Sequence, residues 1–139
     1  MSTDPIKDAF FLYVEDDASN RMVMNLIMEK AMGTQNLVIF ENSADFMARV
    51  KSLPKCPDAF LLDIHVHPYT GFEMLKMLRA DPDYSHVKVI GLTASVTNEE
   101  VEELRDAGFD GAIGKPLNIS TFPDVLVRIL KGETIWFVS

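Results

Sequence analysis

The sequence predicts an α/β fold built on a doubly wound parallel sheet, and two observations support this prediction. Apolar runs of strand length alternate with segments of helical period five times along the chain, which is the pattern of a parallel sheet with helical crossovers. Residues with carboxylate, hydroxyl or amine groups directly follow four of those apolar runs. In a doubly wound sheet, functional groups gather outside the carboxyl ends of the strands, so we expect these groups to meet.

Each element is predicted from its local pattern. The five strands are the apolar runs at residues 10–14, 36–40, 58–62, 87–92 and 111–114. The helices are the segments of helical period at residues 18–32, 43–53, 71–80, 97–107 and 120–131. Residues that end helices follow three of these segments, namely Gly33, Asp81-Pro82 and Gly108. Residues that can cap a helix N-terminus stand near the start of three, namely Ser43, Thr97 or Asn98, and Ser120.

Length and charge indicate one globular domain that does not bind nucleic acid. At 139 residues the chain is long enough to bury a core of its own. We divide it into an N-terminal extension at residues 1–8, one domain at 9–131 and an apolar C-terminal tail at 132–139, and we expect no attached effector domain. The net charge of −8 and the pI near 4.7 argue against a basic surface for nucleic acid.

The sequence indicates neither a membrane nor an oxidising compartment. No apolar stretch approaches the roughly 20 residues that span a bilayer. The start of the chain lacks the charged and apolar regions of a signal peptide. Cys56 is the only cysteine, so no internal disulfide can form. We therefore expect the protein in the cytoplasm.

Three carboxylates, a hydroxyl and an amine are predicted to share one edge of the sheet. Glu15 and Asp16 follow the first strand, and Asp63 follows the third. Thr93 follows the fourth strand and Lys115 the fifth. Clustered carboxylates repel one another unless a cation neutralises them, and hard oxygen ligands suit Mg²⁺, which recruits phosphate oxygens. Because a carboxylate can itself form an acyl phosphate, the pattern indicates Mg²⁺-dependent phosphoryl transfer.

The motifs around these residues resemble the receiver domain of two-component response regulators. The resemblance covers about residues 9–131 and rests on five stretches: Phe11-Leu-Tyr-Val-Glu-Asp-Asp, Phe60-Leu-Leu-Asp-Ile, Gly71-Phe-Glu-Met-Leu, Val89-Ile-Gly-Leu-Thr-Ala and Gly111-Ala-Ile-Gly-Lys-Pro-Leu. It implies a flavodoxin-like, CheY-like sheet of five strands in the order 2-1-3-4-5, with helices on both faces. It also implies a stand-alone signalling domain, which is not an enzyme acting on an external substrate and catalyses only its own phosphorylation and dephosphorylation.

The resemblance also implies how the site works. Asp63 would be the phosphoacceptor and would receive its phosphoryl group from a phosphohistidine. Three carboxylates and one backbone carbonyl would hold Mg²⁺, namely Glu15, Asp16, Asp63 and the carbonyl of His65. Thr93 and Lys115 would contact the phosphoryl group, and a cis peptide bond before Pro116 would aim the amine into the site. The implied partners are a sensor histidine kinase or histidine phosphotransfer protein and a downstream protein target, with neither nucleic acid nor membrane.

Two features depart from the family's usual pattern. In the loop after the acceptor, Pro68 stands one place late, and Thr70 precedes Gly71 where the family usually has an acidic residue or Asn. We therefore expect this loop to follow a different path. Ala112 stands three residues before Lys115, where the family usually has a switch aromatic. A methyl group cannot make the usual inward rotation, so the usual output mechanism is in doubt.

Other functions remain compatible with parts of the pattern. A small aspartyl-phosphate phosphatase of haloacid-dehalogenase type also uses an aspartyl nucleophile, but it needs a second Asp where this chain has His65. A non-phosphorylated protein-interaction module is a further alternative. His65 and His67 are close enough for a transition metal, but the hard oxygens around them favour loop histidines. A flavin site is disfavoured because the loop after the first strand is acidic and would repel a phosphate.

Two apolar segments are candidate contact surfaces. A methionine row on the first helix, Met24, Met28 and Met32, is either the margin of the core or a docking face for a kinase or phosphotransfer protein, and we favour docking. A wider arc on the same helix is expected to face the sheet, and it consists of Met22, Val23, Leu26, Ile27 and Ala31. The tail Ile135-Trp136-Phe137-Val138 needs a partner, because a Trp and a Phe left in water each forgo about 1.5–3 kcal/mol. It either packs on the domain's own helices or forms a homodimer or kinase interface.

Overall fold

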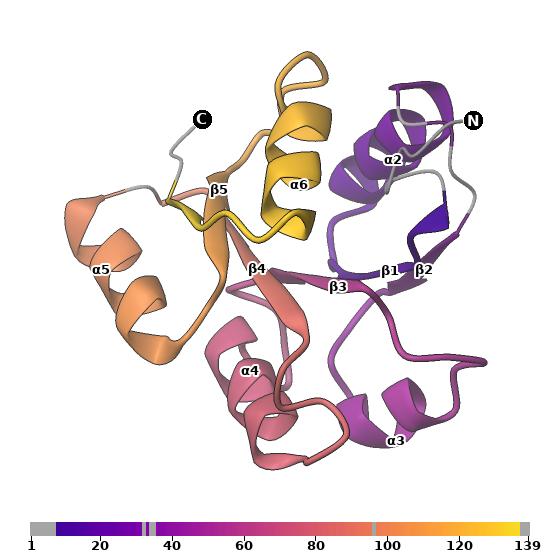
Figure 1. Cartoon of the computed structure of the whole chain (residues 1–139), viewed down its shortest axis with the longest axis vertical. Helices are drawn as coiled ribbons and strands as arrows, with labels where there is room; N and C mark the ends of the chain where they lie inside the picture. Colours follow the sequence, from indigo (N-terminus) through magenta and orange to yellow (C-terminus); the bar gives the residue numbers. More distant parts are fainter. Residues whose placement is uncertain (1–7, 32, 34–35, 96, 137–139) are drawn as a thin grey trace.

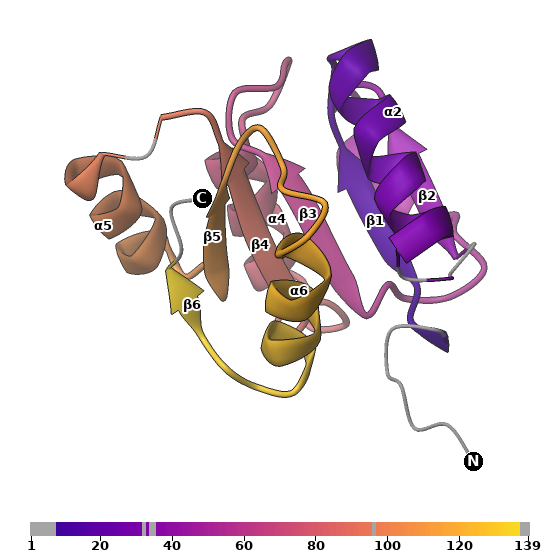
Figure 2. The same cartoon turned by 90° about the horizontal axis from the view of Figure 1, so that it is seen from above.

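Six parallel strands form one sheet in the order β2-β1-β3-β4-β5-β6, with helices on both faces (Figures 1 and 2). The computed structural model describes residues 8–31, 33, 36–95 and 97–136. The strands are β1 (Phe11–Val14), β2 (Leu37–Phe40), β3 (Ala59–Asp63), β4 (Lys88–Thr93), β5 (Gly111–Gly114) and β6 (Ile135–Trp136). The helices are α2 (Ala18–Leu26), continued by the π-helix η1 (Ile27–Ala31), α3 (Phe46–Lys51), α4 (Gly71–Ala80), α5 (Asn98–Ala107) and α6 (Phe122–Leu130).

The predicted fold class and the order of the first five strands are confirmed, and a sixth strand corrects the prediction of five. β6 falls in the segment that was predicted to be a tail, and it lies parallel to β5 with Gly111 opposite Ile135 and Ala112 opposite Trp136. A Cβ on Gly111 would lie 2.9 Å from the carbonyl oxygen of Ile135, so the glycine permits this close approach. The tail residues Ile135 and Trp136 therefore pack on their own domain, against the sheet edge; residues 137–139 lie outside the described residues.

The central strands are buried on both faces of the sheet. In β1, Phe11 and Tyr13 face the layer of α2 and α6, whereas Leu12 and Val14 face the layer of α3, α4 and α5. All four side chains are fully buried. Double burial explains why the strands read as continuous apolar runs rather than as alternating ones.

The first helix packs through a stripe that only partly matches the predicted arc, because Ile27 and, in part, Val23 pack against the core as predicted, whereas Met22 and Leu26 do not. Met24 and Met28 are 0% and 1% exposed, whereas Met22 and Leu26 are 66% and 44% exposed. The stripe that faces the sheet runs through Met24, Ile27 and Met28, whose spacing of three and four residues is itself helical. The docking interpretation is therefore wrong for Met24 and Met28, and Met32 lies outside the described residues.

Helix ends agree with the sequence at some positions and not at others. The Thr97 side chain caps α5, and Gly108 ends this helix with φ of 105°. Asp81 ends α4 in an extended conformation before Pro82, and Gly33 has φ of 65°. No helix in the described part of the chain has the length and apolar character needed to cross a membrane.

Two of the predicted caps are wrong. Asp45 and Thr121 stand at the N-caps of α3 and α6 instead of Ser43 and Ser120, and neither makes a side-chain cap hydrogen bond. The Ser43 side chain is buried and serves another purpose, since its hydroxyl bonds both the carbonyl and the amide of Tyr69 at 2.7 Å. Ser43 thereby links the loop after β2 to the loop after β3.

Candidate functional site

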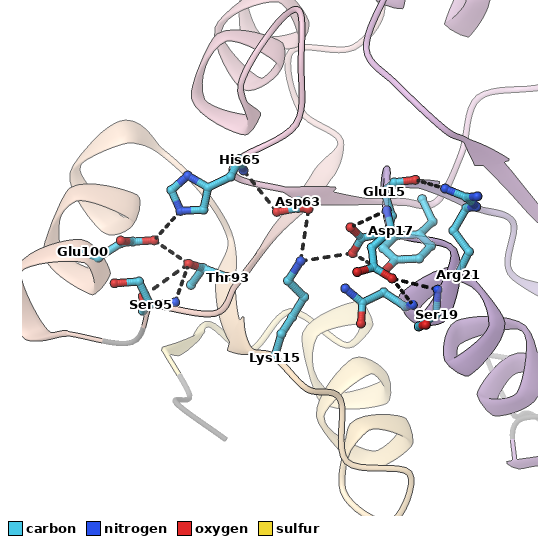
Figure 3. Close-up of polar contacts among 12 residues, drawn as sticks. Glu15, Asp17, Ser19, Arg21, Asp63, His65, Thr93, Ser95, Glu100 and Lys115 are labelled. Carbon is cyan, nitrogen blue, oxygen red and sulfur yellow. Dashed lines mark hydrogen bonds and ion pairs between the residues drawn. The ribbon is translucent and has the colours of Figure 1, made fainter.

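The carboxyl ends of four neighbouring strands bring five polar residues to one edge of the sheet. Figure 3 labels four of them, Glu15, Asp63, Thr93 and Lys115. Asp63 and Thr93 are the last residues of β3 and β4. Glu15 and Lys115 directly follow β1 and β5, and Asp16 comes next after Glu15. Parallel pairing in register keeps these ends level, because Val14 lies opposite Leu62 and Thr93 opposite Gly114.

Glu15, Asp16 and Asp63 form a cluster of carboxylates. Each offers an oxygen atom, and the three atoms all lie within 4.8 Å of one another. Glu15 and Asp63 are buried, whereas Asp16 is exposed and opens the cluster to solvent. Three hard oxygen donors with an open side suit a divalent cation that keeps part of its water shell, which is the preference of Mg²⁺.

Lys115 supplies the positive charge beside this cluster. Its Nζ lies 3.1 Å from Oε1 of Glu15 and 3.0 Å from Oδ2 of Asp63. Although burial lowers the pKa of Lys115, the two carboxylates outweigh it and raise that pKa, so the amine stays charged. The peptide bond between Lys115 and Pro116 is cis, as the family resemblance implied.

Glu15 and Asp63 have opposite pKa shifts. Burial raises the pKa of Glu15, and its hydrogen bond with Asp63 raises it further. Burial also acts to raise the pKa of Asp63, but its interaction with the Glu15 side chain, the hydrogen bond from the backbone N–H of His65 and the charge of Lys115 outweigh burial and lower that pKa. The His65 amide donates to Oδ1 of Asp63 at 3.1 Å. The Asp63 carboxylate is thus held between the Lys115 amine and the His65 amide, a position from which it can act as a nucleophile.

Tyr13 is a residue of the site that we did not predict. Its side chain is fully buried, and its hydroxyl donates to Oε1 of Glu15 at 2.8 Å. Burial and the negative charge of Glu15 raise the pKa of Tyr13 far above its usual value, so the phenol keeps its proton and remains a donor. The signal was present in the sequence, because residues two apart on a strand share a face.

Glu100 is a second residue that we did not predict. Thr93 donates its hydroxyl to Oε1 of Glu100 at 2.5 Å, and the Ser95 amide donates to the Thr93 hydroxyl at 3.0 Å. Nε2 of His65 lies 3.7 Å from the same Glu100 oxygen. Glu100 belongs to the first turn of α5 and not to a strand end, so the rule that located the other residues did not apply to it.

The loop after Asp63 is held close to the site by α4. A Cβ on Gly71 would lie 2.9 Å from Cα of Ile64 and 3.0 Å from the carbonyl oxygen of Asp63, so only glycine allows this approach. The loop also contains a second cis peptide bond, between His67 and Pro68. The role of the His65 carbonyl as a metal ligand stays a prediction.

Comparison with known proteins agrees with this geometry. Residues 11–126 match the family model of the response regulator receiver domain. The chain is 26% identical over 113 residues to stress response regulator protein 1 of Candida tropicalis, which covers 79% of the chain and 41% of that protein. It is 25% identical over 120 residues to hybrid signal transduction histidine kinase A of Dictyostelium discoideum, covering 84% of the chain and 5% of that protein. The chain thus spans less than half the length of either relative.

A solved structure shows the same fold. It is the receiver domain of a sensor histidine kinase from Pseudomonas aeruginosa, described with a magnesium ion coordinated in its active-site cleft. The two chains are 21% identical and superpose with a TM-score of 0.76, over 89% of this chain and 98% of the other.

Proposed function

The chain belongs to the response regulator receiver domain family, and from that premise we propose that it accepts a phosphoryl group onto Asp63 in a Mg²⁺-dependent reaction. The single observation that supports this most directly is the state of Asp63. Its carboxylate is buried, its pKa is lowered, and it lies 3.0 Å from the Lys115 amine. A charged, oriented carboxylate beside a fixed cation is the arrangement that an acyl-phosphate nucleophile requires.

The proposed reaction transfers the phosphoryl group from nitrogen to oxygen. The P–N bond of a phosphohistidine breaks, a P–O bond forms at Asp63, and the histidine nitrogen keeps the electron pair and takes up a proton. Lys115 lies where it can neutralise the new negative charge. Glu15, Asp16, Asp63 and the His65 carbonyl are the proposed ligands of Mg²⁺, which supplies charge neutralisation at the phosphoryl oxygens when bound. The magnesium described for the Pseudomonas neighbour supports this part of the proposal.

Proposed partners follow from the family. Receiver domains take part in phosphorelay with histidine kinases, so we assign as donor a sensor histidine kinase or a histidine phosphotransfer protein. The phosphorylated chain would then act on a downstream protein target or pass the group onward. We propose that the chain works as a single-domain regulator in the cytoplasm and catalyses only its own phosphorylation and dephosphorylation.

Labelling with a small phosphodonor tests this proposal. The full chain is incubated with acetyl phosphate and Mg²⁺, and the modified residue is found by mass spectrometry. We expect one phosphoryl group on Asp63, none on Asp63→Asn, and normal labelling of the exposed control Asp106→Asn. Labelling of Asp63→Asn at the wild-type level would show that the acceptor is another residue. Turnover of acetyl phosphate without a labelled intermediate would favour a phosphatase, and neither labelling nor turnover would favour an interaction module.

A further inference from the structure

The Thr93 hydroxyl, which would contact a phosphoryl group on Asp63, already makes a hydrogen bond to the Glu100 carboxylate. The single hydroxyl proton of Thr93 has two acceptors within reach, and Oε1 of Glu100 at 2.5 Å is nearer than the carbonyl oxygen of Ser95 at 3.3 Å. The same hydroxyl accepts from the Ser95 amide at 3.0 Å, so its position is set by three contacts (Figure 3). A hydrogen bond to a charged acceptor is stronger than one between neutral groups. Thr93 is therefore held by Glu100 before any phosphoryl group arrives.

The start of α5 directs Glu100 inward. The Thr97 hydroxyl accepts from the Glu100 amide at 3.1 Å and so fixes the third residue of the helix. The Glu100 side chain is only 17% exposed, whereas its neighbour Glu99 in the same turn is exposed. The inward position of Glu100 is thus a feature of that residue and not of the whole acidic turn.

A phosphoryl group and the Glu100 carboxylate compete for Thr93. Both are anionic acceptors, and the hydroxyl can donate to only one of them at a time. Like charges also repel one another when they are brought together at a partly buried site. Phosphorylation of Asp63 should therefore break the contact between Thr93 and Glu100.

β5, which lies beside β4, lacks the aromatic side chain that usually rotates inward in this family on phosphorylation. Ala112 is 1% exposed and carries only a methyl group, which has no ring to rotate. Glu100, in contrast, belongs to the helix that packs next to β5 through Leu104. A side chain that is released from Thr93 can move the first turn of that helix.

On the basis of the proposed function, we infer that Glu100 is the switch residue of this chain. It holds Thr93 in the unphosphorylated state, and the phosphoryl group on Asp63 displaces it. Its release moves the start of α5, which performs the role that an aromatic at position 112 would perform. Glu100 is a positioning residue, since it acts through Thr93 and does not take part in the transfer itself.

The test compares Glu100→Ala with the matched variant Glu99→Ala. We expect Glu100→Ala to be labelled by acetyl phosphate about tenfold faster than wild type, because a hydrogen bond to a charged group no longer has to be broken. Glu100→Gln keeps a hydrogen-bond acceptor without the charge, so its labelling rate should lie between those of wild type and Glu100→Ala. Glu99→Ala loses the same helix-terminal charge and should be labelled at the wild-type rate.

A second readout follows the helix itself. On phosphorylation, the backbone amide signals of residues 98–101 should shift in wild type and in Glu99→Ala, and should shift much less in Glu100→Ala. Equal labelling rates together with equal amide shifts in wild type and Glu100→Ala would overturn the inference while leaving the proposed function intact. Absence of label on Asp63 in every variant would overturn the proposed function, and the inference with it.

Discussion

The two sides of Asp63 are built in different ways. The acidic side is defined by Tyr13 on β1, Glu15 and Asp16 directly after β1, and Lys115 directly after β5, and both Tyr13 and Lys115 donate hydrogen bonds to Glu15. On the hydroxyl side, defined by Thr93 and Glu100, the contact depends on one carboxylate carried by α5. Strands that are paired on both edges hold their ends firmly, whereas a helix terminus can shift by itself. We infer that the acidic side is fixed before a phosphoryl group arrives, whereas the hydroxyl side can change its contacts when Asp63 is phosphorylated.

Removing Asp16 should have the largest effect on the acidic side. We expect Asp16→Ala to weaken Mg²⁺ binding by about a hundredfold, because one of the three proposed carboxylate ligands is lost. The fold should persist, since Asp16 is exposed. Titration of Mg²⁺ followed by the amide signals of Glu15 and Asp63 measures this, with Asp106→Ala as the control. An unchanged affinity in Asp16→Ala would contradict the proposed metal geometry.

Removing the Trp136 ring should loosen the hydroxyl side alone. The ring is half-buried against the core layer of α5, and the Arg105 guanidinium lies 5.3 Å from its centre. We expect Trp136→Ala to lower the free energy of unfolding by about 2 kcal/mol. Trp136→Phe should recover most of that loss, and Mg²⁺ affinity should not change. Urea unfolding measures the stability, the amide-detected Mg²⁺ titration measures the affinity, and size-exclusion chromatography follows self-association. Unchanged stability with loss of self-association would instead favour the homodimer interpretation of the tail.

The smallest effect should come from removing single hydroxyls on the two sides. Tyr13→Phe deletes a fully buried donor to Glu15 and should cost about 1 kcal/mol of stability. Thr93→Val deletes the donor to Glu100, whose carboxylate can turn to water, and should cost less than about 0.5 kcal/mol. Thermal unfolding of the two variants in the same buffer compares them. Equal costs would show that the two sides are equally rigid.

Most of the site could be predicted from strand ends. Asp63, Thr93 and Lys115 each close or directly follow an apolar run, and parallel strands bring such positions to one edge. Glu100 could not be predicted in this way, because its direction depends on where α5 begins and how that helix packs on the sheet. The sequence placed the cap of this helix at Thr97 or Asn98, but a cap does not specify which carboxylate of the next turn points inward.

The fold was predictable to a similar degree. Strands buried on both faces have strong signals, and the helices follow from their period. The first helix shows the limit, because two overlapping stripes fit the same period. The predicted arc contains Ile27 but neither Met24 nor Met28, and packing selects the stripe that contains all three. β6 contains two residues, which is too short for any pattern, and only its pairing with Gly111 identifies it.

The position of the one tryptophan has a practical consequence. Trp136 lies on β6 opposite Ala112 and under Arg105 of α5, so its indole borders the helix whose movement we infer. Indole emission depends on nearby charge and on contact with water. The unmodified chain therefore carries its own optical reporter, and a stopped-flow fluorimeter could follow α5 in real time after a phosphodonor is added, without a dye or an isotope label.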